Sequence, residues 1–166
     1  TVRRAAAIAA QKAEKTNAAS VSFWVDLKLG KSAENFGQAL GEGLIMGAHR
    51  LVDFNRSPRK SSLKKLIIQS SKEVSRGAKT GVIVGEGNTF ARRLQDTPAN
   101  KMRPKDMVTE ARKIAKSSPR ISLKALDEKS MEKLGMGSLL SVSRGSSESA
   151  YLIHLVYKPA KKSKRK

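Results

Sequence analysis

The chain has 166 residues, a length that suits one ordinary domain or pieces of two. Its residues are 39% hydrophobic but only 4% aromatic, so a core can form and must be mainly aliphatic. The absence of cysteine excludes disulfides and thiolate metal sites. No apolar run reaches the roughly 20 residues of a membrane-spanning helix, and no signal-peptide pattern is present.

Positive charge is unusually high: 34 basic residues against 14 acidic residues give a net charge of +20. Much of it lies in residues 50–79 and in the last nine residues. Clustered Lys and Arg release counterions from phosphate backbones, so nucleic-acid binding is one interpretation. The other is a solvated face and an exposed loop, because no aromatic side chains for base stacking are interleaved with the charge. Under the first interpretation the contacts come from Arg56, Arg59, Lys60, Lys161, Lys162, Lys164 and Arg165.

The first half of the chain predicts alternating helices and strands. Alanine-rich composition indicates a helix over residues 2–18, and β-branched and aromatic residues indicate a strand over 21–27. Ser32 is a candidate N-cap for a helix over 33–54, and a second strand over 63–68 follows a basic loop. This order favours an α/β layer with a parallel sheet. The helix over 33–54 is interrupted by glycines that suggest close approach of its backbone to a neighbour: Gly37, Gly41, Gly43 and Gly47.

The second half begins with a long helix over residues 70–94, which Pro98 and Asn100 end. A further helix starts at Pro104, since proline is favoured in a first turn, and a strand over 121–126 follows. Asp127 is predicted to cap a short helix over 128–134. Residues 136–142 form an apolar segment of undetermined type, and residues 151–156 form the last strand. Domain boundaries are expected near residues 75 and 95.

No catalytic or metal-binding constellation emerges from the residues themselves. Glu128 and Glu132 share a helix face with two lysines, which is typical of a solvated helix. The Gly85 to Phe90 segment lacks the third glycine of a dinucleotide fingerprint. His49 and His154 are the only histidines, and each is predicted to be packed or on the surface. The serines near Gly145, which are Ser143, Ser146 and Ser147, have no credible histidine partner and are predicted to be loop residues.

A series of motifs in the second half nevertheless resembles a known family. It comprises Asp96 to Asn100, Asp127 to Lys129, Leu134 to Leu140, Ser143 to Ser146 and the strand from Tyr151 to Tyr157. In this order and at these spacings it resembles the leucyl aminopeptidase (cytosol aminopeptidase) family of two-metal peptidases. Asp96 stands where the family commonly has Asn. The first residue is Thr1 and not Met, and a predicted helix begins directly after it, so the chain is expected to be a piece of a longer protein.

The resemblance implies an α/β fold in three parts. Residues 1–72 would be the second half of an N-terminal domain with a mixed or parallel sheet, and residues 73–95 its connecting helix. Residues 96–166 would open a three-layer α/β catalytic domain. The turn of Thr97, Pro98, Ala99 and Asn100 would support the domain junction, with Asn100 bonding neighbouring backbone.

The resemblance also implies an activity for the parent protein. Family members release N-terminal amino acids from peptides with two divalent ions, Zn²⁺ or Mn²⁺, and assemble as cytoplasmic hexamers. Their metal ligands and their catalytic Lys and Arg are expected beyond Lys166, so no catalytic or metal residue is assigned within the chain. We therefore expect residues 1–166 alone to be inactive, and to associate with copies of themselves or with a second chain that completes the catalytic domain. The alternative is a basic nucleic-acid-binding or ribonucleoprotein component built on a partial peptidase scaffold.

Overall fold

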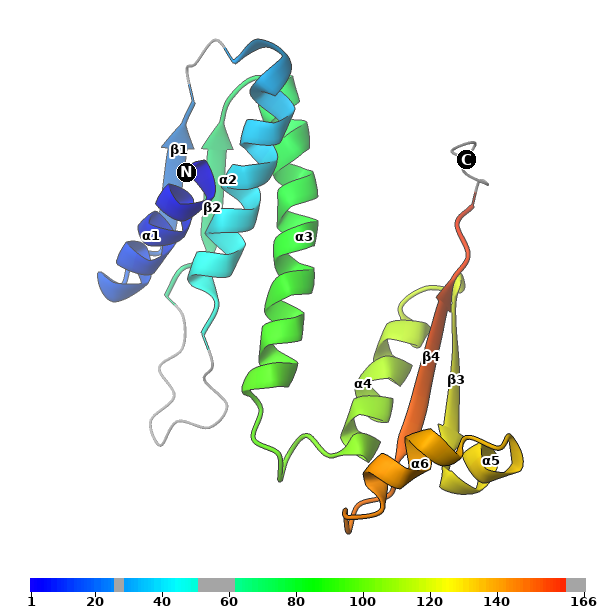
Figure 1. The fold of residues 1–166 in the computed structure, drawn as a ribbon. Coiled ribbons are helices and arrows are strands. Elements are labelled where there is room, and N and C mark those ends of the chain that lie inside the picture. The colour runs from blue at the N-terminus through cyan, green and yellow to red at the C-terminus, as the bar shows by residue number, and fades with distance from the viewer. Residues whose placement is uncertain (26–28, 51–61, 161–166) are drawn as a thin grey trace. The chain divides into compact units, whose positions relative to one another are not determined.

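The computed structural model describes residues 1–25, 29–50 and 62–160. The chain divides into two compact units, Thr1–Asp96 and Thr97–Lys166 (Figure 1). Each unit combines helices with a two-stranded sheet, in agreement with the α/β fold class predicted from the sequence. None of the described helices is both long enough and apolar enough to cross a membrane.

The first unit is built on a parallel pair of strands, as the sequence predicted. β1 (Ser20–Trp24) pairs with β2 (Lys65–Gln69), and Phe23 lies opposite Ile68. α1 (Val2–Lys15) and α2 (Ala33–Ala48) cover the inner face of this pair. The buried core consists of Ala6, Ala10, Leu40 and Leu44, with Phe23, Val25, Leu66 and Ile68 packed against it.

Alternate residues of β1 and β2 point away from this core. On the outward face Trp24 is 81% exposed and Ile67 is 39% exposed. Both strands show the same alternation of half-buried and exposed side chains, because successive side chains of a strand point to opposite faces. The sheet of the first unit therefore has one face packed on helices and one face open among the described residues.

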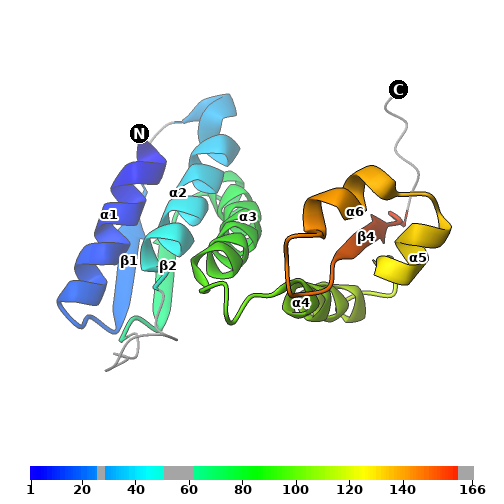
Figure 2. The same ribbon diagram turned by 60° about the horizontal axis from the view of Figure 1, so that its bottom comes forward.

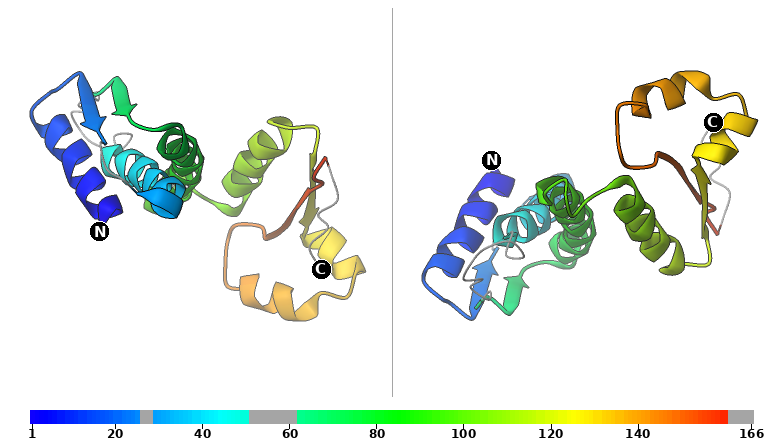
Figure 3. Two further views of the ribbon diagram at one scale, coloured as in Figure 1. Left: turned by 90° about the horizontal axis from the view of Figure 1, so that it is seen from above. Right: turned by 90° about the horizontal axis from the view of Figure 1, so that it is seen from below.

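α2 lies between α1 and α3 (Lys72–Asp96), and both contacts are made through glycine (Figure 3). A Cβ added at Gly37 or Gly41 would overlap the backbone carbonyls of α3, and one added at Gly43 or Gly47 would overlap those of α1. α3 presents its own glycines to α2, at Gly77, Gly81 and Gly85. The close backbone approach that the glycines of α2 predicted is thus confirmed.

Two expected features of α2 are wrong. Ser32 does not cap the helix: it belongs to the short 3₁₀ turn η1 (Gly30–Ser32), has helical backbone angles and makes no side-chain cap bond. The helix also ends at Ala48 instead of continuing to residue 54, because His49 adopts extended backbone angles (φ −63°, ψ 132°). Residues 51–61, which include most of the expected basic loop, lie outside the described residues.

The second unit contains an antiparallel strand pair. β3 (Ile121–Asp127) pairs with β4 (Tyr151–Tyr157), so that Ile121 lies opposite Tyr157. α4 (Pro104–Lys116) packs on both strands, and its Val108 is buried. α5 (Glu128–Lys133) and α6 (Gly137–Ser143) connect the two strands (Figure 1), and Figure 2 shows both helices beside β4. The apolar segment of undetermined type is therefore mainly helical.

Candidate functional site

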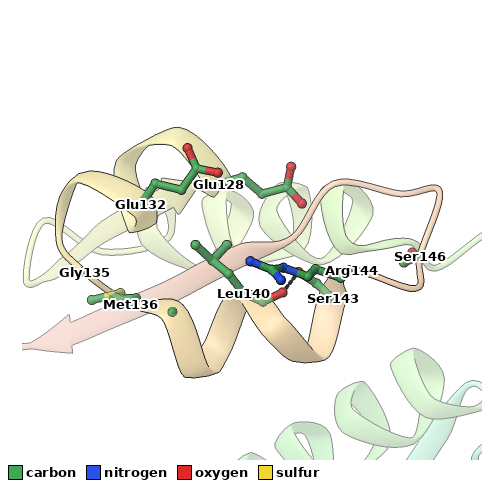
Figure 4. Close-up of a pocket in the computed structure, with 9 residues that line it drawn as sticks. Glu128, Glu132, Gly135, Met136, Leu140, Ser143, Arg144 and Ser146 are labelled. Carbon is green, nitrogen blue, oxygen red and sulfur yellow. Dashed lines mark hydrogen bonds between the residues drawn. The ribbon is translucent and has the colours of Figure 1, made fainter.

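α5, α6 and the loop after α6 line an open pocket of about 510 Å³ in the second unit (Figure 4). The pocket coincides with the stretch that carries the family-like motifs. It is lined by Glu128, Glu132, Gly135, Met136, Gly137, Leu140, Ser143, Arg144 and Ser146.

The pocket wall formed by α5 begins with the predicted cap. The Asp127 carboxylate accepts a hydrogen bond of 2.9 Å from the Ser130 backbone N–H. The Ser130 side chain and this backbone N–H lower the pKa of Asp127. At the other end, Gly135 has φ +69°, a conformation that favours glycine, and the Met136 N–H returns to the Met131 carbonyl at 3.1 Å. Local hydrogen bonds thus fix the turn between α5 and α6.

The two glutamates of the pocket have different surroundings. Glu128 is half-buried, and its Oε1 accepts a 2.9 Å hydrogen bond from the Ala150 backbone N–H, just before β4. Glu132, one turn later, is exposed. The exposed Glu132 agrees with the solvated helix that the sequence indicated, whereas Glu128 has a structural role, because it ties the loop before β4 to α5.

Serine and arginine side chains complete the lining without forming a nucleophile and its base. The Ser143 hydroxyl donates to the Leu140 carbonyl at 3.0 Å, and Ser146 Oγ accepts from the Glu148 N–H at 3.0 Å. Arg144 projects beside Leu140 on the α6 side of the pocket (Figure 4). No histidine lines the pocket, so its serines lack the base that nucleophilic catalysis requires.

The two histidines lie elsewhere. His154 is exposed on β4, opposite Lys124 in the strand register. His49 is in the first unit, where its Nε2 lies 3.9 Å from Asp96 Oδ2. The prediction that each histidine is packed or on the surface agrees with both positions.

A two-metal centre does not fit the residues that the structure describes. Within those ranges no three or more His, Asp or Glu side chains come together as a possible metal site. Two of the buried carboxylates are engaged by cations instead: Glu42 accepts from Arg3 Nε at 2.6 Å, and Glu14 lies 3.6 Å from Arg50. Co-catalytic metal ions need several clustered carboxylates, and the described residues do not provide them.

The proposed junction turn opens the second unit. The N–H groups of Lys101 and Met102 both donate to the Pro98 carbonyl, at 2.8 and 3.0 Å. Arg103 N–H then donates to Asp106 at 3.0 Å, which begins α4. These backbone bonds close the turn over residues 97–102, while a support role for Thr97, Pro98, Ala99 and Asn100 stays a prediction.

The residues proposed for nucleic-acid contact cannot be placed. Arg56, Arg59 and Lys60 fall in residues 51–61, and Lys161, Lys162, Lys164 and Arg165 fall in residues 161–166, all outside the described residues.

Several contacts of these sites link residues far apart in the chain, and most of them correspond to no local sequence pattern. Arg103 Nη1 donates to Glu148 at 3.4 Å, and this bond and the charge of Glu148 raise the pKa of Arg103. Glu128 reaches the backbone of Ala150. One partial signal exists in the first unit, where Gln38 and Glu42 are four residues apart on α2 and their side chains bond at 2.8 Å.

Comparison with protein families finds one match in the second half of the chain. Residues 89–166 match the family model described as the catalytic domain of the cytosol aminopeptidase family. A probable cytosol aminopeptidase from Aquifex aeolicus is 30% identical over 168 residues, covering 100% of this chain and 33% of the relative. Another, from Solibacter usitatus, is 37% identical over 131 residues, covering 78% of this chain and 27% of the relative.

Solved structures agree with these relatives. A mutant of tomato leucine aminopeptidase matches with a TM-score of 0.87 and 28% identity, over 98% of this chain and 34% of that chain. The bottromycin maturation enzyme BotP in complex with Mn matches with a TM-score of 0.80 and 26% identity, over 96% of this chain and 33% of that chain. The chain thus spans about a third of the length of the relatives that it matches. These comparisons lend no support to the nucleic-acid alternative.

Proposed function

We propose that this chain, which belongs to the cytosol aminopeptidase family, forms part of a metal-dependent exopeptidase. The whole enzyme would release N-terminal amino acids from peptides. The observation that carries the proposal is the extent of the match. The relative from Aquifex aeolicus aligns with the whole chain, and the tomato enzyme shares its fold over 98% of it. Both units are therefore covered by the same relatives.

Within such a protein we assign a scaffold role to the described residues. Residues 1–72 would complete an N-terminal domain, residues 73–95 would form its connecting helix, and residues 96–166 would open the catalytic domain. The start of the family match at residue 89 supports this order. Two carboxylates at the start of α5 support it too, because Asp127 caps that helix and Glu128 holds a loop. Peptide substrates would then be bound and cleaved with groups outside the described residues.

The metal dependence of the parent protein is part of the same proposal. The Mn in the BotP complex supports a divalent ion, and the family resemblance implies two ions, Zn²⁺ or Mn²⁺. The described residues hold no cluster of His, Asp and Glu side chains that could bind these ions. A cytoplasmic location is supported by the relatives, which are named cytosol aminopeptidases, and a hexameric assembly is supported by the family resemblance alone.

Hydrolysis and metal binding by the purified chain test the scaffold role. We expect residues 1–166 to release no product from leucine amide with added Mn²⁺ or Zn²⁺, and to show no tight two-ion binding by calorimetry. Hydrolysis that depends on the metal would contradict the claim that the essential groups lie outside the described residues.

A chimera tests the family activity itself. The matching third of the Aquifex aeolicus relative is replaced by this chain, and the unmodified relative is the control. If the chain is a peptidase scaffold, a folded chimera should retain leucine amide hydrolysis. A chimera that folds and assembles like the control but hydrolyses no peptide substrate would contradict the proposed function.

The net charge of +20 is the one observation that favours the second candidate, a nucleic-acid-binding protein. Filter binding of the chain at about 50 and about 200 mM salt separates the two functions, because phosphate contacts weaken steeply with salt. The nucleic-acid function would be contradicted if the chain bound no nucleic acid, or if its affinity did not fall as the salt concentration rose.

A further inference from the structure

A small pocket of about 270 Å³ lies in the first unit and is lined by α1, α2 and α3. α1 contributes Arg3 and Arg4 to its lining, and α3 contributes Arg92. These three arginines come from helices on opposite sides of α2 (Figure 3). None of the described residues that line the pocket is acidic. The pocket therefore gathers positive charge in a small volume, an arrangement that attracts anions.

Close helix packing holds the backbones that carry these arginines. Gly43 and Gly47 of α2 line the pocket, and a Cβ at either position would overlap the α1 backbone at Arg3 or Ala7. α3 is held against α2 in the same way, through Gly81. The arginines thus project from helices in backbone contact with α2, so little ordering of the backbone is needed for them to bind a common ligand.

Only one of the three arginines has a carboxylate partner among the described residues. Arg3 Nε donates to the buried Glu42 Oε2 at 2.6 Å, and Glu42 Oε1 accepts from Gln38 Nε2 at 2.8 Å. The side chains of Arg4 and Arg92 form no hydrogen bond or ion pair with another described residue. Two guanidinium groups of the pocket are therefore available to an anion from solution.

We propose that this pocket binds a phosphate group, either as the free ion or as part of a small phosphate monoester. Guanidinium groups present paired N–H donors that match phosphate oxygens. A tetrahedral anion has oxygens in several directions and can contact arginines on both sides of α2, whereas a carboxylate presents two oxygens in one plane. The volume suits such a group, because pockets for drug-sized ligands start at about 300 Å³.

This site is independent of the proposed peptidase function, since all its lining residues lie in the first unit. It also shares no residue with the set considered for nucleic-acid contact, which lies outside the described residues. Loss of one function would therefore leave the other untested by the same experiment.

An NMR titration of the full chain with inorganic phosphate tests the site, at an ionic strength held constant with sodium chloride. We expect saturable shifts of the backbone amides of the first turn of α1 and of residues around Gly43, Gly47 and Arg92. Acetate should bind about tenfold more weakly, because it has one charge and two oxygens. Glycerol 3-phosphate identifies the source: tighter binding than inorganic phosphate indicates a monoester, and equal or weaker binding indicates the free ion.

Charge-removing variants test the arginines. Arg4→Gln and Arg92→Gln should each weaken phosphate binding about three- to tenfold, the range of a partly exposed charge-assisted contact. Lys79→Gln is the matched control, because Lys79 is an exposed cation of α3 outside the pocket lining. Its effect should stay below about twofold, since screening weakens distant charges.

Three results would overturn the proposal: no saturable shifts at the pocket, equal affinities for acetate and phosphate, or an equal loss of affinity in Lys79→Gln and in the two arginine variants. Folded arginine variants that bind phosphate as tightly as the unmodified chain would overturn it as well. Arg4 and Arg92 are exposed, so both variants should fold, and their amide spectra verify this. If either variant failed to fold, the comparison of acetate with phosphate on the unmodified chain would decide.

Discussion

A single exposed carboxylate organises the start of α5. Asp127 has its pKa lowered by the hydrogen bonds from the Ser130 side chain and backbone N–H. A carboxyl group whose pKa is lower in the folded chain contributes stability above its unfolded pKa, and this contribution is lost as the pH falls through the folded value. Asp127 therefore stabilises the second unit at neutral pH and ceases to do so in acid.

We expect Asp127→Ala to destabilise the second unit modestly at neutral pH and to have a smaller effect in strong acid, because the stability from the wild-type cap is lost as the pH falls through the lowered pKa of Asp127. Urea unfolding at pH ~7 and pH ~2, followed by NMR signals of β3 and β4, measures the difference. Glu132→Ala is the matched control, since Glu132 is an exposed carboxylate of the same helix. An equal effect of Asp127→Ala at both pH values would contradict the cap role.

The sequence predicted Asp127 correctly because a cap depends on neighbours within three residues. It could not predict the partners of Glu128 or His49 in the same way. Glu128 bonds to Ala150, and His49 faces Asp96, across turns whose geometry the intervening residues decide.

At the scale of elements, the first unit depends on three helices whose backbones touch. α2 meets α3 at Gly37 and Gly41 and meets α1 at Gly43 and Gly47. Side chains cannot fit between backbones that lie so close, so these positions admit only glycine without a shift of a helix. The glycine spacing revealed the contact in the sequence, but it could not reveal which helix lay opposite each glycine.

Substitution of glycine by alanine measures this packing. We expect Gly41→Ala and Gly81→Ala each to lower the free energy of unfolding of the first unit by about 1–3 kcal/mol, because the added Cβ overlaps backbone atoms of the facing helix. Gly87→Ala is the control on α3, since its Cβ meets nothing within 4 Å. It should be neutral or stabilising by up to about 1 kcal/mol, because alanine has the higher helix propensity. Equal losses at all three positions in urea unfolding would contradict backbone contact as the cause.

Strand pairing shows the same limit of sequence-based prediction. β-branched and aromatic residues located β1, alternation of apolar and polar residues located β3, and the order of helices and strands in the first half predicted the parallel pair. Ser32 misled the prediction of the N-terminus of α2, because the preceding 3₁₀ turn already supplied helical geometry. Local residue type could not reveal that turn, whose Ser32 N–H bonds to the Leu29 carbonyl at 3.0 Å.

At the scale of the whole molecule, each unit has its own buried residues. Leu44 is 1% exposed in the first unit, and Met131 is fully buried in the second. We expect Leu44→Ala to destabilise the first unit by about 2–5 kcal/mol and to leave the second unit unchanged. Met131→Ala should destabilise the second unit and leave the first unit unchanged. Hydrogen exchange with mass spectrometry resolves the two units by peptide. Equal destabilisation of both units by either variant would contradict their independence.

The open face of the first unit has an optical consequence. Trp24 is the only tryptophan of the chain, and at 81% exposure its indole is surrounded by solvent. Indole emission shifts to shorter wavelength when water leaves the ring, so the tryptophan fluorescence of the folded chain reports on that face. A molecule that covers the open face of β1 and β2 would therefore shift the emission maximum of Trp24 to shorter wavelength, and the shift could be measured without a label.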